Sequence, residues 1–349
     1  MKGDATSSGD PARRLRYTAG RRYPSSPMVT DAELRAVLTT GLDAPVSPRA
    51  RELIDFITNA FGPSIAAIIH YGSRAQKTGS KPDSAYDFFV IVDDYETAFL
   101  SFAEKAHPGF SARSAILLSR FLPPSIVALT HFPGEQNTAK CAVLSLKDLF
   151  VECSSDSPDH FVKGRLFQQL QLAWFRDDKS KEAAENAIVA ARLATFQWGA
   201  PYLPKKFSAE DYCWTLLKTS FAGEIRPETA VRIRELLNAQ APTMFPVYEA
   251  LLQKKLEDDL LRQEDGSYSL VNPPSPTEKA RVDAYFRRSK ARATTRWVKL
   301  IWLYDGWLDY LSRKIGRRAN HSIDLTPQER RWPFLFLWPK LIRYINSRR

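Results

Sequence analysis

The chain has 349 residues, 44% of them hydrophobic, and carries a net charge of +11. This length is enough for two or three domains, each with a hydrophobic core. No stretch is apolar over the roughly 20 residues that a spanning helix needs, so a membrane span is not indicated. The three cysteines lack metal-binding spacing and are predicted to be buried free thiols, so a zinc site is not indicated either.

The first 27 residues are polar and rich in Arg, Gly, Ser and Pro, without the apolar core of a secretory signal. We predict that segment 1–27 is disordered. A weak transit peptide, or an upstream start that precedes a true initiator at Met28, would account for the same composition.

Residues 28–150 alternate between helical and extended patterns. An amphipathic helix is expected from Ser47, and the apolar runs Ile65 to Tyr71 and Asp87 to Val92 are expected to be buried neighbouring strands. Further helices are predicted over 31–42 and 97–106, a short apolar element over 113–122, and further strands over 126–132 and 140–146. This order predicts an α/β domain with a mixed sheet of the nucleotidyltransferase type, ending near residue 150.

The region 151–271 is predicted to be a helical domain. Ser208 and Asp211 resemble a capping box at the start of one of its helices. The expected elements are a mostly helical stretch at 160–200, helices at 208–221, 229–239 and 246–261, a turn at 264–267 and a proline-rich linker at 272–276.

The basic charge of the chain is concentrated near its C-terminus. Residues 281–349 hold 17 Lys and Arg against 5 Asp and Glu, while residues 1–280 hold 33 against 34. Tryptophans stand at 297, 302, 307, 332 and 338, and the apolar residues of 297–315 share one helical face opposite Lys299 and other charged residues. We predict a basic, amphipathic, membrane-associating segment at 272–349; packing on the protein's own core is the alternative.

Gly72 and Ser73 follow the first predicted strand, and Asp87 opens the second. Gly72 would let the backbone approach a triphosphate, and Ser73 offers a hydroxyl followed by peptide N–H groups. A carboxylate at the mouth of a core strand needs a partner, so Asp87 is a candidate catalytic residue and ligand of Mg²⁺. A tight strand-to-helix connection, with Asp87 as a cap, is the alternative.

The second metal-binding carboxylate is harder to place. Many nucleotidyltransferases carry two carboxylates two residues apart on one face of a strand, but the residue two before Asp87 is Ala85. Asp83 is the nearest substitute, and Asp93 and Asp94 are further candidates. Asp93 is six residues from Asp87, or roughly 20 Å along a continuous strand, so the two cannot share one ion there.

Three basic residues are candidates for contacts with phosphate. Lys140, near the start of a predicted strand, is the second candidate catalytic residue because its ammonium can neutralise phosphate charge; a solvated strand-edge lysine is the alternative. Arg165 and Arg226 are candidates for bidentate phosphate binding. A salt bridge from Arg226 to Glu224 or Glu228 is an equally good account of that arginine.

A series of short motifs runs in order through residues 65–227. They are Tyr71-Gly72-Ser73 with Gln76, Asp87-Phe88 with Val92-Asp93-Asp94, Ala139 to Val143, Lys163 to Leu166, and Leu203-Pro204 with Phe207 followed by Ser220 to Arg226. In this series the chain resembles the mitochondrial-type phosphatidate cytidylyltransferases, or translocator maintenance proteins, which have bacterial members. It departs from that pattern at Arg74 and Tyr95, where the family has glycine and proline.

The resemblance implies transfer of a cytidylyl group from CTP to phosphatidate, giving CDP-diacylglycerol and pyrophosphate, with Mg²⁺ required. It implies that Tyr71, Gly72, Ser73 and Gln76 bind the nucleotide. The expected partners are CTP, phosphatidate and an anionic membrane surface, and nucleic acid is not expected. The expected location is peripheral, on the cytoplasmic face of the inner membrane or, in a eukaryote, on the matrix side of the inner mitochondrial membrane.

Two other hypotheses stay open. A nucleotidyltransferase that modifies a small soluble substrate would not need the basic C-terminal segment. A degenerate transferase domain that binds lipid or RNA without catalysis would account for the missing carboxylate at Ala85.

Overall fold

The computed structural model describes residues 30–78, 84–129, 138–224, 228–303 and 326–331. The predicted disordered segment 1–27, the candidates Asp83 and Arg226, and most of the tryptophan-rich C-terminal segment lie outside these residues. None of the helices in the described ranges combines the length and the apolar character needed to cross a bilayer.

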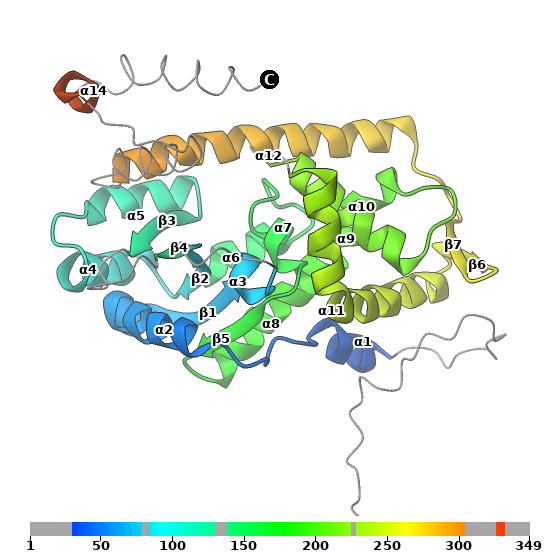
Figure 1. Ribbon diagram of the computed structural model, residues 1–349, viewed down its shortest axis with the longest axis horizontal. Helices are drawn as coiled ribbons and strands as arrows, with labels where there is room; N and C mark the ends of the chain where they lie inside the picture. The colour runs from blue at the N-terminus through cyan, green and yellow to red at the C-terminus, as the bar shows by residue number, and fades with distance from the viewer. Residues whose placement is uncertain (1–29, 79–83, 130–137, 225–227, 304–325, 332–349) are drawn as a thin grey trace, which may run out of the picture.

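A five-stranded mixed sheet forms the centre of the N-terminal half, in the order β3-β4-β2-β1-β5 (Figure 1). Strands β2 and β4 are parallel, and the other neighbouring pairs are antiparallel. The strands are β1 (Ile65–Tyr71), β2 (Tyr86–Val92), β3 (Ser125–Leu129), β4 (Ala139–Ser145) and β5 (Gln171–Phe175). The mixed α/β class predicted from the sequence is confirmed at this level.

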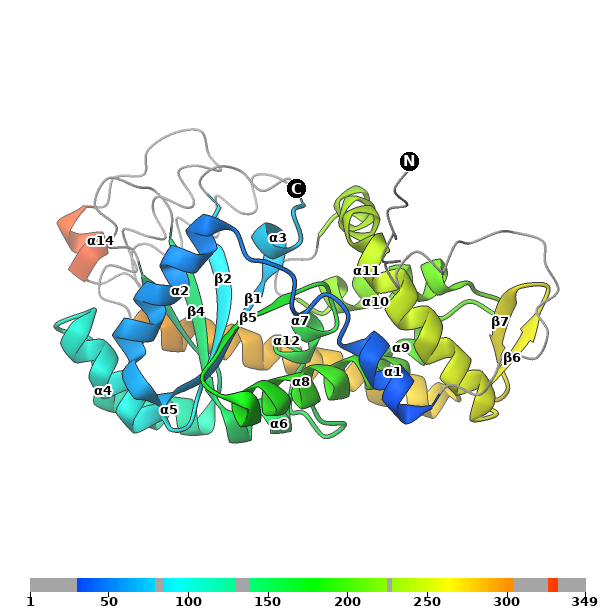
Figure 2. The same cartoon turned by 90° about the horizontal axis from the view of Figure 1, so that it is seen from below.

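Helices cover both faces of the sheet, as Figure 2 shows from below. One face packs against α2 (Pro48–Phe61), α4 (Tyr95–Lys105) and α5 (Ala112–Phe121). The other packs against α6 (Leu146–Cys153), α7 (Lys163–Leu166) and α8 (Asp178–Leu193). Because both faces are covered, the strands read as continuous apolar runs, and all seven residues of β1 are buried.

The prediction that the sheet domain ends near residue 150 is wrong. Strand β5 pairs with β1 and contributes an edge of the sheet, although it lies inside the stretch 160–200 that was expected to be mostly helical. The sequence Gln171-Leu-Ala-Trp-Phe175 contains no β-branched residue but ends in two aromatic residues, which are common in strands. The segment is too short for a clear local pattern, and pairing with the buried β1 fixes it as a strand.

A second, mainly helical half follows around its own apolar core. The predicted Ser208–Asp211 capping box is present at the start of α10. Two helices were expected over 229–261, but one helix, α11, runs through Pro242 and Pro246. The elements of this half are α1 (Asp31–Leu38), α9 (Thr195–Gly199), α10 (Ala209–Ala222), α11 (Ala230–Glu257), β6 (Leu261–Glu264) and β7 (Ser267–Leu270). The remaining short elements are the 3₁₀ turns Gly62–Ser64 and Ala200–Tyr202 and the helices α3 (Gly72–Ala75) and α14 (Pro327–Arg331).

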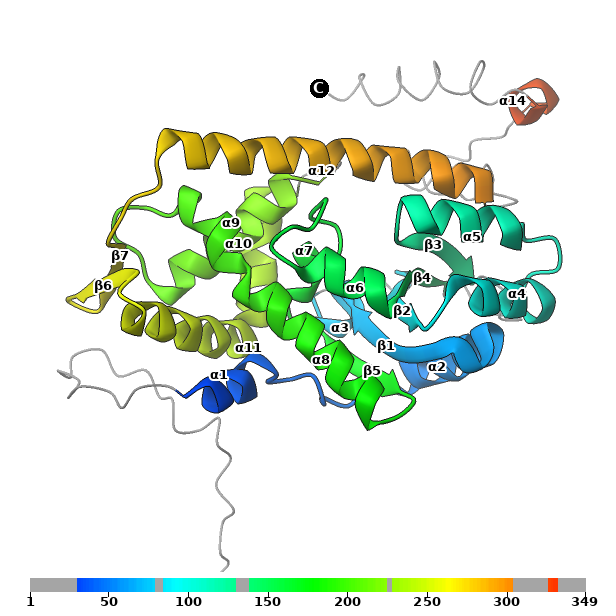
Figure 3. The same cartoon turned by 180° about the vertical axis from the view of Figure 1, so that it is seen from behind.

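The long helix α12 (Pro276–Leu303) joins the two halves. It runs along one side of the molecule, past the helical half and then past α5 and β3, as Figures 1 and 3 show. At its first turns Val282 and Phe286 enter the helical core. Further along, Arg296 and Lys299 are buried, at 4% and 5% exposure.

Burial of Lys299 corrects the prediction that it faces solvent from the polar side of a membrane helix. Its Nζ donates to the carbonyl oxygens of Leu118 and Leu122, at 3.2 and 2.9 Å, at the C-terminal end of α5. The carbonyl of Leu118 also accepts the capping N–H of Leu122 at 3.0 Å, and a cation at the C-terminal end of a helix is favoured by the helix dipole. Residues 276–299 of the predicted membrane-associating segment therefore belong to the folded body.

Candidate functional site

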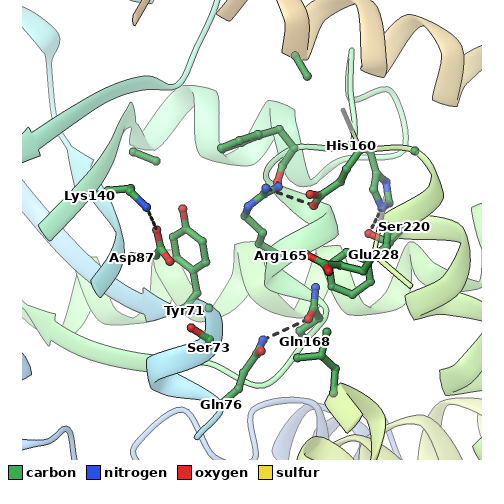
Figure 4. Close-up of a pocket in the computed structure, with 18 of the residues that line it drawn as sticks. Tyr71, Ser73, Gln76, Asp87, Lys140, His160, Arg165, Gln168, Ser220 and Glu228 are labelled. Carbon is green, nitrogen blue, oxygen red and sulfur yellow. Dashed lines mark hydrogen bonds and ion pairs between the residues drawn. The ribbon is translucent and has the colours of Figure 1, made fainter. Parts of the chain in front are cut away.

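A cavity of about 410 Å³ lies at the edge of the sheet where β1 ends and β2 and β4 begin (Figure 4). Tyr71, Asp87 and Lys140 are consecutive cross-strand neighbours in the register of β1, β2 and β4, so their side chains share one face. Seven of the predicted site residues line this cavity: Tyr71, Gly72, Ser73, Gln76, Asp87, Lys140 and Arg165.

Asp87 and Lys140 form the charged pair at the sheet edge. Lys140 Nζ lies 3.9 Å from Asp87 Oδ1, and the two side chains are 32% and 29% exposed. The distance is too long for a strong hydrogen bond. Both groups are thus held side by side yet remain open to a ligand in the cavity.

Gly72 is required by the position of Asp87. Its φ is +79°, and a Cβ added there would lie 2.8 Å from Asp87 Oδ2. A side chain at position 72 would therefore push on the carboxylate itself, besides adopting an unfavourable backbone conformation. The glycine was expected to make room for a phosphate; the contact that the structure shows is with Asp87.

Tyr71 closes the same edge of the sheet. Its ring stacks on Phe89, with centroids 4.4 Å apart. Burial, with the nearby charge of Asp87, raises the pKa of Tyr71 well above its usual value. The phenol consequently stays protonated and can donate a hydrogen bond to an acceptor in the cavity.

The other two described carboxylate candidates are not in the cavity. Asp93 follows the opposite end of β2 and pairs with Arg176, Nη1 to Oδ2 at 2.5 Å. Asp94 caps α4 by accepting from the backbone N–H of Thr97 at 2.8 Å. Asp93 is therefore wrong as a partner of Asp87 in one metal site.

The donors at the sheet edge fit a Mg²⁺ ion that takes most of its ligands from substrate and water. Within the described residues no group of three or more His, Cys, Asp or Glu side chains is placed to hold a metal. Asp87 supplies one carboxylate and Ser73 one hydroxyl on the cavity wall. Mg²⁺ is commonly held by one or two carboxylates together with substrate phosphates, so this set is compatible with the ion only when a phosphate ligand is present.

Arg165 occupies the middle of the cavity between Asp87 and His160 (Figure 4). Its Nη1 donates to the carbonyl of Phe161 at 2.8 Å, and its Nη2 lies 3.2 Å from Glu224 Oε1. Burial opposes its charge, but the carboxylate of Glu224 keeps the pKa of Arg165 above its usual value. Glu224, which was considered above as a salt-bridge partner of Arg226, thus pairs with Arg165.

Gln76 connects the turn after β1 to the opposite wall. Its Nε2 donates to Gln168 Oε1 at 3.1 Å, and Gln168 Nε2 donates to the carbonyl of Gly164 at 2.8 Å. Both glutamines are buried. This chain of amides fixes the distance between α3 and α7 across the floor of the cavity.

The far wall contains two residues that were not predicted as site residues. His160 and Ser220 face each other, with Nε2 and Oγ 3.1 Å apart. Burial, with the charges of Lys163 and Arg165, lowers the pKa of His160 to about 3. The imidazole is therefore neutral at physiological pH and cannot act as a cation toward phosphate. No local motif marks it, since its partner lies 60 positions away in the chain.

Helix α12 also supplies part of this wall, through Ser289, Ala293 and Arg296. The guanidinium of Arg296 lies 5.1 Å from the ring centre of Phe161, and that of Arg165 lies 4.0 Å from it. Both distances are within the range of cation–π attraction. Phe161 thus links the arginine predicted to bind phosphate to the long C-terminal helix.

Asp159 holds α12 in this position. Its buried carboxylate accepts from Arg292 Nε at 2.9 Å and from both terminal nitrogens of Arg296. Arg296 also donates to the carbonyl of Pro123. Desolvation opposes ionisation of Asp159, but the two arginines lower its pKa. Both arginines that pair with Asp159 therefore come from α12.

Compared with models of known protein families and with curated proteins, the chain matches none.

Proposed function

We propose that the chain is a Mg²⁺-dependent nucleotidyltransferase that transfers a cytidylyl group from CTP to phosphatidate. The observation that carries the proposal is the single cavity into which Gly72, Ser73, Asp87, Lys140 and Arg165 converge from separate parts of the sequence. A volume of about 410 Å³ is within the range of small-molecule sites. Its charged lining suits a polyanionic substrate.

In the proposed reaction a phosphate oxygen of phosphatidate attacks the α-phosphorus of CTP. The bond from that phosphorus to the bridging oxygen of the β-phosphate breaks, and pyrophosphate leaves with the electron pair. Catalysis of such a step consists mainly of positioning and charge stabilisation. Lys140 and Arg165 would neutralise phosphate oxygens, and the protonated Tyr71 would donate to one of them.

Asp87 would hold Mg²⁺, with Ser73 as a further oxygen donor. When bound, the ion would supply charge neutralisation at the phosphates of the leaving group. Lys140 beside Asp87 would keep the carboxylate oriented toward the cavity until nucleotide arrives.

A membrane-peripheral location is part of the proposal. A diacyl acceptor stays in the bilayer, and the basic, tryptophan-rich sequence beyond α12 would bring the cavity to an anionic surface. The folded position of α12 itself, against α5 and β3, limits the proposed membrane-binding part to the sequence after residue 303.

The deciding experiment incubates the purified full-length protein with labelled CTP, Mg²⁺ and phosphatidate vesicles, followed by lipid extraction. Label is expected in the lipid phase as CDP-diacylglycerol, with release of one pyrophosphate for each lipid formed. Vesicles that lack phosphatidate, and reactions with chelator, are the controls. Absence of labelled lipid under conditions in which CTP binds would contradict the proposal.

A second candidate function follows from the single carboxylate at the start of β2. Ala85 occupies the position of the usual second carboxylate, and the described residues provide no cluster that holds a metal unaided. A transferase-like domain that binds nucleotide or lipid without turnover fits this observation. It is distinguished by CTP binding that does not require Mg²⁺ and yields no pyrophosphate.

A further inference from the structure

A second cavity, of about 780 Å³, is lined mainly by residues of α10 and α12 on the helical half. Its lining positions on α12 are 283, 286, 287 and 290, which have the spacing of a single helical face. On α10 they are 211, 214, 215, 218, 219 and 222, again one face. The Leu203-Pro204 turn closes one side, so the space is a groove between two helices, here called the α10–α12 groove.

The α10–α12 groove has an apolar and aromatic lining. Tyr202, Leu203, Trp214 and Phe286 contribute to it. Trp214 is half-buried and Phe286 is buried, so these rings are held by the helical core and do not need a ligand to be ordered. Such a concave apolar surface accepts a single hydrocarbon chain, whereas a flat bilayer cannot enter it.

Three cations lie along the same groove. Lys218 comes from α10, and Arg287 and Lys290 come from α12; all three side chains are exposed. Within the described part of the chain, none of the three has an ion pair or a side-chain hydrogen bond. Three unpaired cations held on two facing helices offer charge to an anionic group between them.

The carboxylates of the groove are already engaged. Asp211 accepts from the N–H and hydroxyl of Ser208 in the capping box. Asp283 accepts from the hydroxyl of Tyr202 at 2.6 Å and pairs with Lys279 at 3.0 Å. Asp283 also feels the charge of Arg287, but neither carboxylate forms an ion pair with Lys218, Arg287 or Lys290 within the described residues, and two carboxylates face three cations, so the groove keeps an excess of positive charge.

We propose that the α10–α12 groove binds a single-chain amphiphilic anion, a hydrocarbon chain joined to a phosphate headgroup. The chain lies along Tyr202, Leu203, Trp214 and Phe286, and the headgroup reaches Lys218, Arg287 and Lys290. Gly223 lines both this groove and the cavity at the sheet edge, so the two sites are adjacent but separate. The proposal stands whether or not the sheet-edge cavity transfers a nucleotide.

The test titrates the full-length protein, without CTP, with octyl phosphate and decyl phosphate below their critical micelle concentrations. Burying two more methylene groups should tighten binding by about 15-fold. Inorganic phosphate should bind far more weakly than either, and decanol should lose the contribution of the cations. Equal affinity for octyl and decyl phosphate, or for decyl phosphate and decanol, would overturn the proposal.

Matched variants locate the binding. The double variant Lys218→Gln/Lys290→Gln should weaken decyl phosphate binding at least about 10-fold, whereas Arg281→Gln/Arg288→Gln removes two exposed charges of α12 outside the groove and should leave it unchanged. Ala222→Trp fills the groove without altering its charge and should also abolish binding. Equal losses in the two double variants, or full binding by Ala222→Trp, would refute binding in the groove.

Discussion

At the scale of single residues, the arrangement of Asp87 gives the sharpest expectation. Asp87→Asn keeps the shape of the side chain and removes its charge, so turnover should fall by at least about 100-fold while the thermal unfolding midpoint changes little. Asp93→Asn is the matched control, since Asp93 follows the other end of β2 and pairs with Arg176. Lipid labelling at saturating CTP is the measurement. Equal turnover of Asp87→Asn and wild type would remove Asp87 from the site.

Gly72 allows backbone strain to be separated from the clash with Asp87. Gly72→Ala should destabilise the fold by roughly 1–2 kcal/mol because φ is positive, and it should also displace the Asp87 carboxylate, which lies 2.8 Å from the added Cβ. Gly266→Ala, at φ +75° with no atom within 4 Å, carries the backbone cost alone. Denaturant unfolding should show similar losses for both variants, and only Gly72→Ala should lower turnover.

Lys299 gives a pH dependence of stability. Burial, together with Arg296, lowers its pKa to about 7, so between pH 7 and the pKa of an exposed lysine the unfolded chain binds more protons than the folded one. The free energy of unfolding should therefore rise with pH across this window, by up to about 1.4 kcal/mol per pH unit from this group. Denaturation at pH 7.5 and 9 should show this rise in wild type relative to Lys299→Met. Parallel pH profiles for the two proteins would contradict it.

The residues of the candidate site differ in how far sequence could reveal them. Gly72, Ser73, Asp87 and Lys140 stand beside strand ends, where a local pattern indicates both the element and the edge. His160, Ser220 and Arg296 enter the same cavity from contacts between positions 60 to 137 apart in the chain. Nothing in the residues flanking them indicates those partners, so they become visible only when the fold is known.

At the scale of elements, α12 is stabilised by charges buried against the sheet half. Within the described residues two arginines pair with the buried carboxylate of Asp159, and Arg296→Met leaves only one of them, Arg292. A loss of about 3–5 kcal/mol is expected, since breaking a buried pair leaves an uncompensated charge. Urea denaturation checks this loss. Adding Asp159→Asn should restore part of it, and a double variant no more stable than Arg296→Met would refute the account.

The elements that were predicted incorrectly share one cause. β5 has only five residues without a clear alternating pattern, but it pairs with β1. α11 continues through two prolines because its apolar residues pack on α1 and α10. The basic, amphipathic pattern of α12 is typical of a membrane-surface helix. In the fold, however, Lys299 donates to carbonyl groups at the end of α5, and Arg296 pairs with the carboxylate of Asp159. In each case tertiary contacts override the local preference, whereas helices and strands with clear caps and apolar runs could be located from sequence.

At the scale of the whole molecule, the position of α12 predicts different outcomes for two truncated chains. A chain ending at residue 280 loses Arg292, Arg296 and Lys299 and is expected to unfold, so it cannot report on membranes. A chain ending at residue 303 keeps these contacts and should retain CTP binding by calorimetry. It should lose most binding to anionic vesicles, which in the full-length protein should persist in part at high salt because of buried apolar area. Unchanged vesicle binding by the shorter chain would contradict this division.

The contacts of Asp159 also govern when the molecule can be completed during its synthesis. The chain leaves the ribosome from its N-terminus, so all five strands of the sheet are available long before Arg292 and Arg296, which follow Asp159 by 133 and 137 positions. Until α12 emerges, Asp159 lacks both of its arginine partners and the cavity lacks the wall that α12 supplies. Translation of α12 is therefore the event that completes both the pairing of Asp159 and the wall of the candidate site.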